Sequence, residues 1–380
     1  MLASQRDLFD IPREVCYLNA AAWGPLPREA VEAGRIGVAR KAQPWRIDAD
    51  FATAQYARAR AAAGALIGAA AEDIAIIPSV GYGISTAAKA LALGRGSRVL
   101  VLAEDHSSPV LEWHARAASD GILVEALPRP PDGDWTGAVL GAISDAAPFA
   151  ALSISTVHWS DSGCVDPARI APALRDAGGA LILDATHAAG VTPIDVAAID
   201  PDFLVFPTYK WTLGPYGRAF LYVAKRRQDA VPLEQTAYGR RGVAAEQTIY
   251  LADLRYRDGA ARFDMGERDH FVSLEMAAIG MELVASWGAA SLAERLGALT
   301  ARLARGVAER DVTFLPASLR APQILSLGFP RGLPAALPGR LAAAGVHVAA
   351  RLGRLRISPH AYNDEADIDR FLDVFRDAMR

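Results

Sequence analysis

The feature that most constrains the fold of this chain is a regular alternation of apolar runs with helical segments. The runs are apolar throughout instead of at every second residue, which is typical of strands that helices cover on both faces. Six runs are predicted strands, at residues 74–78, 98–103, 150–155, 180–184, 203–206 and 219–223. Segments with helical periodicity lie between them, for example at residues 85–93, 109–120 and 167–176. This alternation predicts an α/β domain with a mostly parallel sheet.

The pattern changes after about residue 259. Two long helices are predicted at residues 271–287 and 290–309, and a last helix at residues 365–379. Short strand-like pieces lie between them, at residues 323–327, 346–349 and 355–357. The order predicts a smaller α+β domain, so we divide the chain into a large α/β domain at residues 16–258 and a small domain at residues 1–15 and 259–380.

Composition excludes several classes of function. The 380 residues carry a net charge of −3, so no general electrostatic field favours nucleic acid, and no apolar run has the length of a membrane span. The cysteines are Cys16 and Cys164, without CxxC spacing, so neither a disulfide framework nor a zinc site is expected. Because a secretory signal core is also absent from the first residues, we expect a reducing, cytoplasmic location and no bound metal.

Two chemically important side chains follow predicted strands. Asp184 closes the run at 180–184, and Lys210 follows the run at 203–206, just before the turn Gly214-Pro215-Tyr216-Gly217. Pyridoxal phosphate needs both groups, because an amine forms a Schiff base with its aldehyde and a carboxylate keeps its pyridine nitrogen protonated. Taken singly, the aspartate could cap a helix and the lysine could lie on the surface. Together they favour a cofactor site.

The chain resembles the class V aminotransferase family of fold-type-I pyridoxal-phosphate enzymes. The resemblance runs from the motif at residues 17–25 (Tyr-Leu-Asn-Ala-Ala-Ala-Trp-Gly-Pro) to the motif at residues 356–363 (Arg-Ile-Ser-Pro-His-Ala-Tyr-Asn). The family includes cysteine desulfurases, kynureninases and isopenicillin-epimerase-like proteins. Membership implies a sheet of the seven-stranded type, a small C-terminal domain, and a homodimer with its active site at the subunit boundary.

The segment at residues 78–85 (Pro-Ser-Val-Gly-Tyr-Gly-Ile-Ser) lies between a predicted strand and a predicted helix. Backbone amides at such a helix start hold phosphate groups, although the same pattern also occurs in plain tight turns. The resemblance implies that Val80, Gly81 and Tyr82 bind the cofactor phosphate. It also implies that Tyr209, with Thr208 as a second candidate, donates a hydrogen bond to that phosphate.

Two histidines are expected at the cofactor ring. His106 lies seven residues before Trp113, a spacing at which relatives carry a ring that stacks on the cofactor. A local turn hydrogen bond is the alternative role for His106. His187, on the loop after Asp184, matches a residue that bonds the phenolic oxygen of the cofactor.

The resemblance also implies residues for substrate. Arg356 matches the arginine that binds the substrate α-carboxylate, for which a planar guanidinium is suited, and a surface salt bridge is the alternative. Trp159 and His158 either shape the substrate pocket or pack under its floor. Trp159 stands near the position of an asparagine in desulfurases, so the contact of that asparagine with the cofactor is in doubt. Asn19, in the N-terminal motif, is a further expected substrate residue.

Two segments depart from the desulfurase pattern. The loop at residues 344–353 contains no cysteine where desulfurases carry their catalytic thiol. The segment at residues 263–268 resembles one that reaches the phosphate of the other subunit, but Glu267 stands near a threonine position and would repel phosphate. Arg268 would make this contact instead, or the contact is lost.

These residues predict a pyridoxal-phosphate enzyme that acts at Cα of a small amino acid, with Lys210 as Schiff-base lysine and general base. An aminotransferase-type reaction is the favoured interpretation. Elimination by a C–S lyase and epimerisation are the alternatives. A cysteine desulfurase and a non-catalytic cofactor-binding homologue are less favoured.

Overall fold

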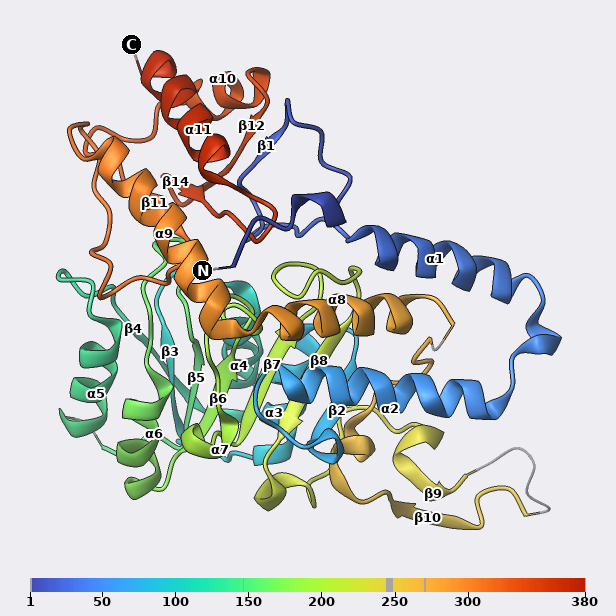
Figure 1. Ribbon diagram of the computed structural model, residues 1–380. Coiled ribbons are helices and arrows are strands. Elements are labelled where there is room, and N and C mark those ends of the chain that lie inside the picture. Colours follow the sequence, from blue (N-terminus) through green and yellow to red (C-terminus); the bar gives the residue numbers. More distant parts are fainter. Residues whose placement is uncertain (1, 146, 244–248, 270, 380) are drawn as a thin grey trace.

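The computed structural model describes residues 2–379 except 146, 244–248 and 270 (Figure 1). Its centre is a seven-stranded sheet with the strand order β2-β8-β7-β6-β5-β3-β4. Strand β8 runs antiparallel to its neighbours β2 and β7, and the other neighbouring strands pair in parallel. The predicted mostly parallel sheet is therefore confirmed. The strands are β2 (Ile74–Ile77), β3 (Arg98–Leu102), β4 (Leu123–Leu127), β5 (Ala151–Ser155), β6 (Ala180–Asp184), β7 (Phe203–Pro207) and β8 (Ala219–Val223).

The central strands are apolar at every position because both faces of the sheet are covered. In β7, Phe203 and Val205 face one hydrophobic cluster, whereas Leu204 and Phe206 face the other. Helices α3 (Val80–Leu91) and α4 (Ser107–Asp120) contribute to the first cluster. The second cluster includes residues of helices α2 (Ala49–Ala65), α5 (Trp135–Asp145), α6 (Pro167–Asp176), α7 (Val196–Ile199) and α8 (Ser273–Trp287).

Two features of the sheet region differ from the sequence expectation. Helix α3 begins at Val80 instead of residue 85, because Ser79 caps it by accepting a hydrogen bond from the Tyr82 amide at 3.1 Å. The glycines of this first turn weaken the helical signal in the sequence. Strand β4 is not predicted, because it forms the edge of the sheet and its residues are only partly buried, with Glu125 among them.

The C-terminal part forms a second, smaller sheet of strands β11 (Leu325–Leu327), β14 (Arg354–Ile357) and β13 (Ala349–Arg351), all antiparallel. The predicted strand at 346–349 is divided between two sheets. Its first residues form β12 (Val346–His347), which pairs with β1 (Cys16–Tyr17), and Ala349 is the first residue of β13. The division of the chain into two domains stays a prediction. The other elements are α1 (Arg28–Lys41), β9 (Arg240–Gly242), β10 (Asp253–Tyr256), α9 (Ala289–Val307), α10 (Leu337–Ala343) and α11 (Glu365–Ala378).

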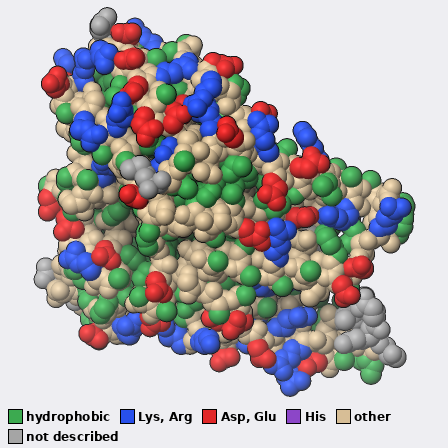
Figure 2. Space-filling model, viewed as in Figure 1, with side chains coloured by type: hydrophobic (Ala, Val, Ile, Leu, Met, Phe, Trp, Pro, Cys, Tyr) green, Lys and Arg blue, Asp and Glu red, His purple; other side chains and the backbone are tan. Residues whose placement is uncertain are grey.

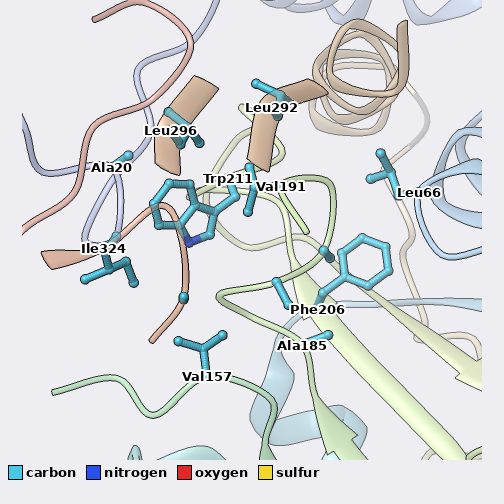
Figure 3. Close-up of a cluster of buried hydrophobic side chains, with 14 of the residues drawn as sticks. Ala20, Leu66, Val157, Ala185, Val191, Phe206, Trp211, Leu292, Leu296 and Ile324 are labelled. Atoms are coloured by element: carbon cyan, nitrogen blue, oxygen red, sulfur yellow. The ribbon is translucent and has the colours of Figure 1, made fainter. Parts of the chain in front are cut away.

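The loop that follows β7 is anchored by a buried tryptophan. Figure 3 shows the indole of Trp211 among Ala20, Leu296 and Ile324, which come from the N-terminal segment, from α9 and from the segment before β11. Because Trp211 is almost fully buried, this packing fixes the backbone of the residue directly before it, Lys210.

Basic and acidic side chains are interspersed over the face seen in Figure 2. No single helix in the described part of the chain has the length and apolar composition to cross a membrane; only α8 and α9 taken together, at a bend of 78°, satisfy those criteria.

Candidate active site

The candidate site lies at the carboxyl ends of the parallel strands, where ligands bind in open α/β sheets. Asp184 is the last residue of β6, Ser155 is the last residue of β5, and Lys210 follows β7 closely. A cavity of about 320 Å³ opens there. Its lining includes Val80, Gly81, His106, Ser155, Trp159, Asp184, His187, Tyr209, Lys210 and Tyr216.

A smaller cavity of about 170 Å³ adjoins the first. The two share a wall formed by His106, Trp159, Tyr209, Lys210 and Tyr216. Trp23, Arg351 and Arg356 line only the smaller cavity, whereas Asp184 and the start of α3 line only the larger one. Lys210 therefore stands between a compartment that contains a carboxylate and one that contains two arginines.

Lys210 is buried, with 7% of its surface exposed, and its Nζ lies 3.4 Å from His187 Nε2. The pKa of Lys210 is lowered from its ordinary 10.5 to about 7, first by burial and then by the positive charge of Arg356, against the opposing effect of Asp184. The amine can therefore be unprotonated near neutral pH, as a nucleophile or general base requires.

The hydrogen bonds of His187 define its tautomer. The Trp211 indole N–H donates to His187 Nδ1 at 3.0 Å, and an indole nitrogen can only donate. Burial lowers the pKa of His187 well below its ordinary value, so the ring is neutral and its single proton sits on Nε2. His187 thus presents an N–H toward Lys210 Nζ, and Trp211 both packs the loop and orients this histidine.

Asp184 is almost fully buried and accepts a hydrogen bond from the Thr186 amide at 2.8 Å. Burial raises the pKa of Asp184, so its charge needs a cationic partner in the cavity. A protonated pyridine nitrogen is such a partner.

A second carboxylate, Asp105, lies behind this site and is absent from our sequence-based candidates. It accepts hydrogen bonds from Ser155 Oγ at 2.8 Å and from the His106 amide at 2.7 Å. Burial and the nearby Asp184 raise the pKa of Asp105 to about 7. Asp105 therefore links the end of β5 to His106, which stands at the N-terminal boundary of α4.

The start of α3 provides an anion site in the larger cavity. Val80 and Gly81 line it at the first two helical positions, whose amides have no partner within a helix. A Cβ added to Gly81 would meet no protein atom closer than Ser79 Oγ at 4.0 Å, so glycine leaves open room here. Tyr82 does not line this cavity: its amide donates to Ser79 and its phenol donates to Glu234 at 3.1 Å, and its predicted contact with the phosphate stays a prediction.

Arg356 on β14 is 2% exposed. Its Nη1 donates to the Trp159 carbonyl at 2.8 Å, and its buried Nε has no partner among the described residues. Burial, followed by the charge of Arg351, lowers the pKa of Arg356 to about 9. A buried guanidinium with an unused donor, at the wall of a cavity, is suited to bind a carboxylate.

Of the aromatic residues predicted at the site, three line both cavities. The His106 ring meets Trp159 edge-to-face at 5.6 Å, and Tyr209 packs against Tyr216 at 4.5 Å between ring centroids. The Trp159 indole donates to the Glu104 carbonyl at 2.7 Å, which fixes its orientation. Tyr216, in the turn that follows Lys210, is also a wall residue of both cavities.

Besides Tyr82, three predicted site residues line neither cavity. The Thr208 hydroxyl donates to the Pro215 carbonyl at 2.6 Å and closes the loop around Lys210. His158 is fully buried and stacks on Trp135 at 4.8 Å, which corresponds to the packing alternative. Asn19 forms a bridge in the backbone with the C-terminal part of the chain. Their positions support structural roles.

The segment expected to reach a second subunit is engaged within its own chain. Arg268 pairs with Asp264, and its guanidinium lies over the rings of Tyr56 and Tyr238 at 3.7 and 4.1 Å. This packing does not leave Arg268 extended toward a partner. The homodimer stays a prediction.

The residues around the larger cavity fit pyridoxal phosphate. The cavity combines an amine, a buried carboxylate, free amides at a helix start and the ring of His106. Besides Asp105, sequence reasoning missed Ser107 and Ser108 at the start of α4, Arg218 as a wall residue, and Arg351. A Ser-Ser-Pro sequence at the start of a helix is a signal that could have indicated the serines.

Comparison with known proteins identifies the family. The family described as aminotransferase class-V matches residues 16–371. Isopenicillin N epimerase from Amycolatopsis lactamdurans is 27% identical over 248 residues, which cover 63% of this chain but only 61% of that protein. The uncharacterized aminotransferase YcbU from Bacillus subtilis (strain 168) is 26% identical over 336 residues, or 85% of this chain and 82% of that protein.

Solved structures share the fold. An apo cysteine desulfurase from Thermococcus onnurineus NA1 superposes with a TM-score of 0.85 at 20% identity, covering 99% of this chain and 98% of that one. The cystine C-S lyase C-DES, solved with its product cysteine persulfide, gives a TM-score of 0.86 at 20% identity over 96% and 98% of the two chains. The chain belongs to the class V aminotransferase family and is a pyridoxal-phosphate-dependent enzyme of fold type I.

Proposed function

We propose that this enzyme binds an amino acid through Arg356 and moves a proton at its Cα with Lys210, in an aminotransferase-type reaction. The observation that carries the proposal is the position of Lys210 between the two cavities, with Asp184 in one and Arg356 in the other. This arrangement supports an amino acid whose carboxylate enters the smaller cavity while its amine approaches the larger one.

Arg356 positions the substrate. Its unused Nε donor and its place at the cavity wall suit a carboxylate, and the Trp159 carbonyl holds the guanidinium in one orientation. Pyridoxal phosphate, when bound, supplies an electron-withdrawing ring that stabilises negative charge at Cα. Asp184, Val80 and Gly81 are the residues that would hold its ring nitrogen and its phosphate.

Lys210 is the proposed base at Cα. Its lowered pKa, about 7, leaves the amine able to accept a proton and to return it near neutral pH. His187, with its proton on Nε2, donates toward Lys210 Nζ and holds the lysine side chain in place. The rings of His106, Trp159 and Tyr209 form a shared wall of the two cavities beside Lys210.

The cysteines argue against sulfur transfer. Neither lines the two cavities, and the loop at residues 344–353 has no cysteine. Burial raises the pKa of Cys16 to about 12 and that of Cys164 to about 11, so neither is a reactive thiolate at neutral pH. Epimerisation is the second candidate, favoured by the similarity to isopenicillin N epimerase, and elimination of a sulfur leaving group is the third.

The test is an amino-acid panel with the purified holoenzyme in deuterated water. Every candidate reaction begins at the Cα proton, so exchange of that proton, followed by mass spectrometry, detects a substrate whatever the outcome. Transamination then yields a keto acid with retention of nitrogen on the cofactor, elimination releases ammonia, and epimerisation yields the opposite enantiomer.

We expect at least one amino acid to exchange and to form a keto acid without release of ammonia. Lys210→Ala should abolish exchange, whereas Lys225→Ala, a lysine on the segment after β8, should not. Exchange that persists in Lys210→Ala would contradict the proposal, as would the absence of exchange with every amino acid.

A further inference from the structure

The smaller cavity contains one more cation than a simple amino-acid carboxylate requires. Arg356 and Arg351 both line it, and both lie on the hairpin formed by β13 and β14. Arg356 on β14 pairs with Ala349 on β13. Arg351 lies two residues further along β13 than Ala349, so Arg351 and Arg356 are diagonal neighbours on the same face of the hairpin. Such diagonal neighbours are about 7–8 Å apart, a separation that one small ligand can span.

The two guanidiniums have no anionic partner in the described part of the chain. Among the described residues, no carboxylate forms an ion pair with either arginine, and none lines the smaller cavity. Within residues 2–379 as the structure describes them, the hydrogen bond of the Arg351 side chain is to the carbonyl of its neighbour Ala350, at 2.7 Å. A third arginine on this face, Arg354, is used within the protein because it donates to the Ser326 carbonyl at 3.0 Å.

Arg356 is buried and Arg351 is half-buried, so their like charges repel each other in the cavity and a bound anion would relieve this repulsion. The effect is visible in the site, because Arg351 contributes to the lowered pKa of Arg356. One α-carboxylate would satisfy Arg356 and leave Arg351 without a partner. A natural ligand with two anionic groups would satisfy both.

We propose that the substrate is an acidic amino acid, with its α-carboxylate on Arg356 and the anionic end of its side chain on Arg351. The assignment rests on the proposed function for its α-carboxylate and deepens it by naming the substrate class. The cavity of about 170 Å³ suits a short side chain of the length of aspartate or glutamate. Arg351 then determines specificity and does not take part in the proton transfer.

The experiment measures binding to the holoenzyme by titration calorimetry, with glutarate and with its monoamide glutaramate. The two ligands have nearly the same shape and differ by one charge, and neither carries an amine that could react. We expect glutarate to bind at least about tenfold more tightly, the scale of one charged hydrogen bond. Arg351→Gln should bring the two affinities together by weakening glutarate, and Arg351→Lys should retain part of the preference.

Two further variants serve as comparators. Arg356→Lys should weaken both ligands, because an ammonium cannot reproduce the paired hydrogen bonds of a guanidinium to the shared carboxylate. Arg331→Gln removes an exposed arginine that pairs with Asp311 and lines neither cavity, so it should change neither affinity.

Equal binding of the two ligands by the wild-type enzyme would overturn the proposal, as would failure to bind either. An unchanged preference in Arg351→Gln would also overturn it, and an equal loss of both ligands would place Arg351 on the α-carboxylate. The binding experiment does not depend on turnover. If the enzyme prefers glutarate over glutaramate through Arg351 but exchanges no Cα proton, only the proposed reaction is contradicted. Exchange of neutral amino acids without that preference would contradict only the substrate class.

Discussion

Burial sets the protonation of the groups around Lys210. The same removal from water lowers the pKa of the amine of Lys210 and of the ring of His187, and raises the pKa of the carboxyl group of Asp184. The amine and the ring therefore lose their charges readily, whereas the carboxylate needs a cation beside it. These are the states that a lysine base and a partner of a protonated pyridine require.

The first prediction concerns the apo protein and pH. Capture of pyridoxal phosphate by Lys210 needs the neutral amine, so its rate should rise as pH increases through about 7 and level off above about 8. Absorbance of the captured cofactor after mixing measures this rate, and Lys210→Ala reports any binding without capture. A rise centred near the ordinary lysine pKa of 10.5 would show that burial does not act on this amine as described.

The second prediction concerns Asp184. Asp184→Asn should still bind the cofactor, because the phosphate site at α3 is intact, but should slow Cα proton exchange by at least about a hundredfold. An uncharged amide cannot hold a proton on the pyridine nitrogen. Cofactor content and exchange rate are measured on the same sample. Exchange near the wild-type rate would remove Asp184 from this role.

Part of this site could be predicted from the sequence alone. Asp184 and Lys210 were predictable because they follow apolar strands, whose carboxyl ends necessarily share one edge of a parallel sheet. Asp105 and Arg351 could not be predicted as site residues, because the direction of their side chains depends on turns. Arg351 precedes a turn in which Leu352 and Gly353 both have positive φ, a geometry that the sequence alone does not specify.

At the scale of elements, helix α3 brings the anion site to the sheet. Gly83 allows a close approach to β7, since a Cβ there would lie 2.7 Å from a methyl group of Val205. The helix therefore lies directly against the strand that precedes Lys210. The strands were predicted well because burial on both faces leaves an unbroken apolar signal. The start of α3 was not predicted, because its glycines have a low helix propensity. Gly83 is needed for close packing against β7, and Gly81 leaves room for a ligand.

The third prediction tests the start of α3. Gly81→Val should lower cofactor affinity by about tenfold or more, because the new side chain would occupy open cavity space beside the first amides of the helix. Gly141→Val in α5 is the matched control, since a Cβ there also meets no atom but lies outside both cavities. Equal cofactor affinities of the two variants, measured by equilibrium dialysis, would argue against phosphate binding at α3.

At the scale of the whole molecule, the site depends on segments far apart in the sequence. The Gly24 amide donates to the Tyr209 carbonyl at 2.8 Å, so the N-terminal segment supports the lysine loop. Arg356 comes from the C-terminal sheet and is held by Trp159 from the end of β5. The family could be recognised from local motifs, whereas the positions of His158 and Asn19 depend on contacts with distant segments and could not be predicted from those motifs.

The fourth prediction uses the cysteines as a test of the whole active-site assignment. A Cys16→Ser and Cys164→Ser double variant should keep its activity on the true substrate, because neither thiol lines a cavity and both are held protonated by burial. A folded but inactive double variant, or a persulfide trapped on either cysteine during turnover, would instead indicate sulfur transfer.

The most direct test of the central claim is to reduce the holoenzyme with borohydride and map the labelled peptide by mass spectrometry. The chain has only four lysines, Lys41, Lys89, Lys210 and Lys225, and each falls in a different part of the sequence. We expect the reduced cofactor to be attached to Lys210 alone and Lys210→Ala to carry no label. Attachment to another lysine, or a full label in Lys210→Ala, would contradict it.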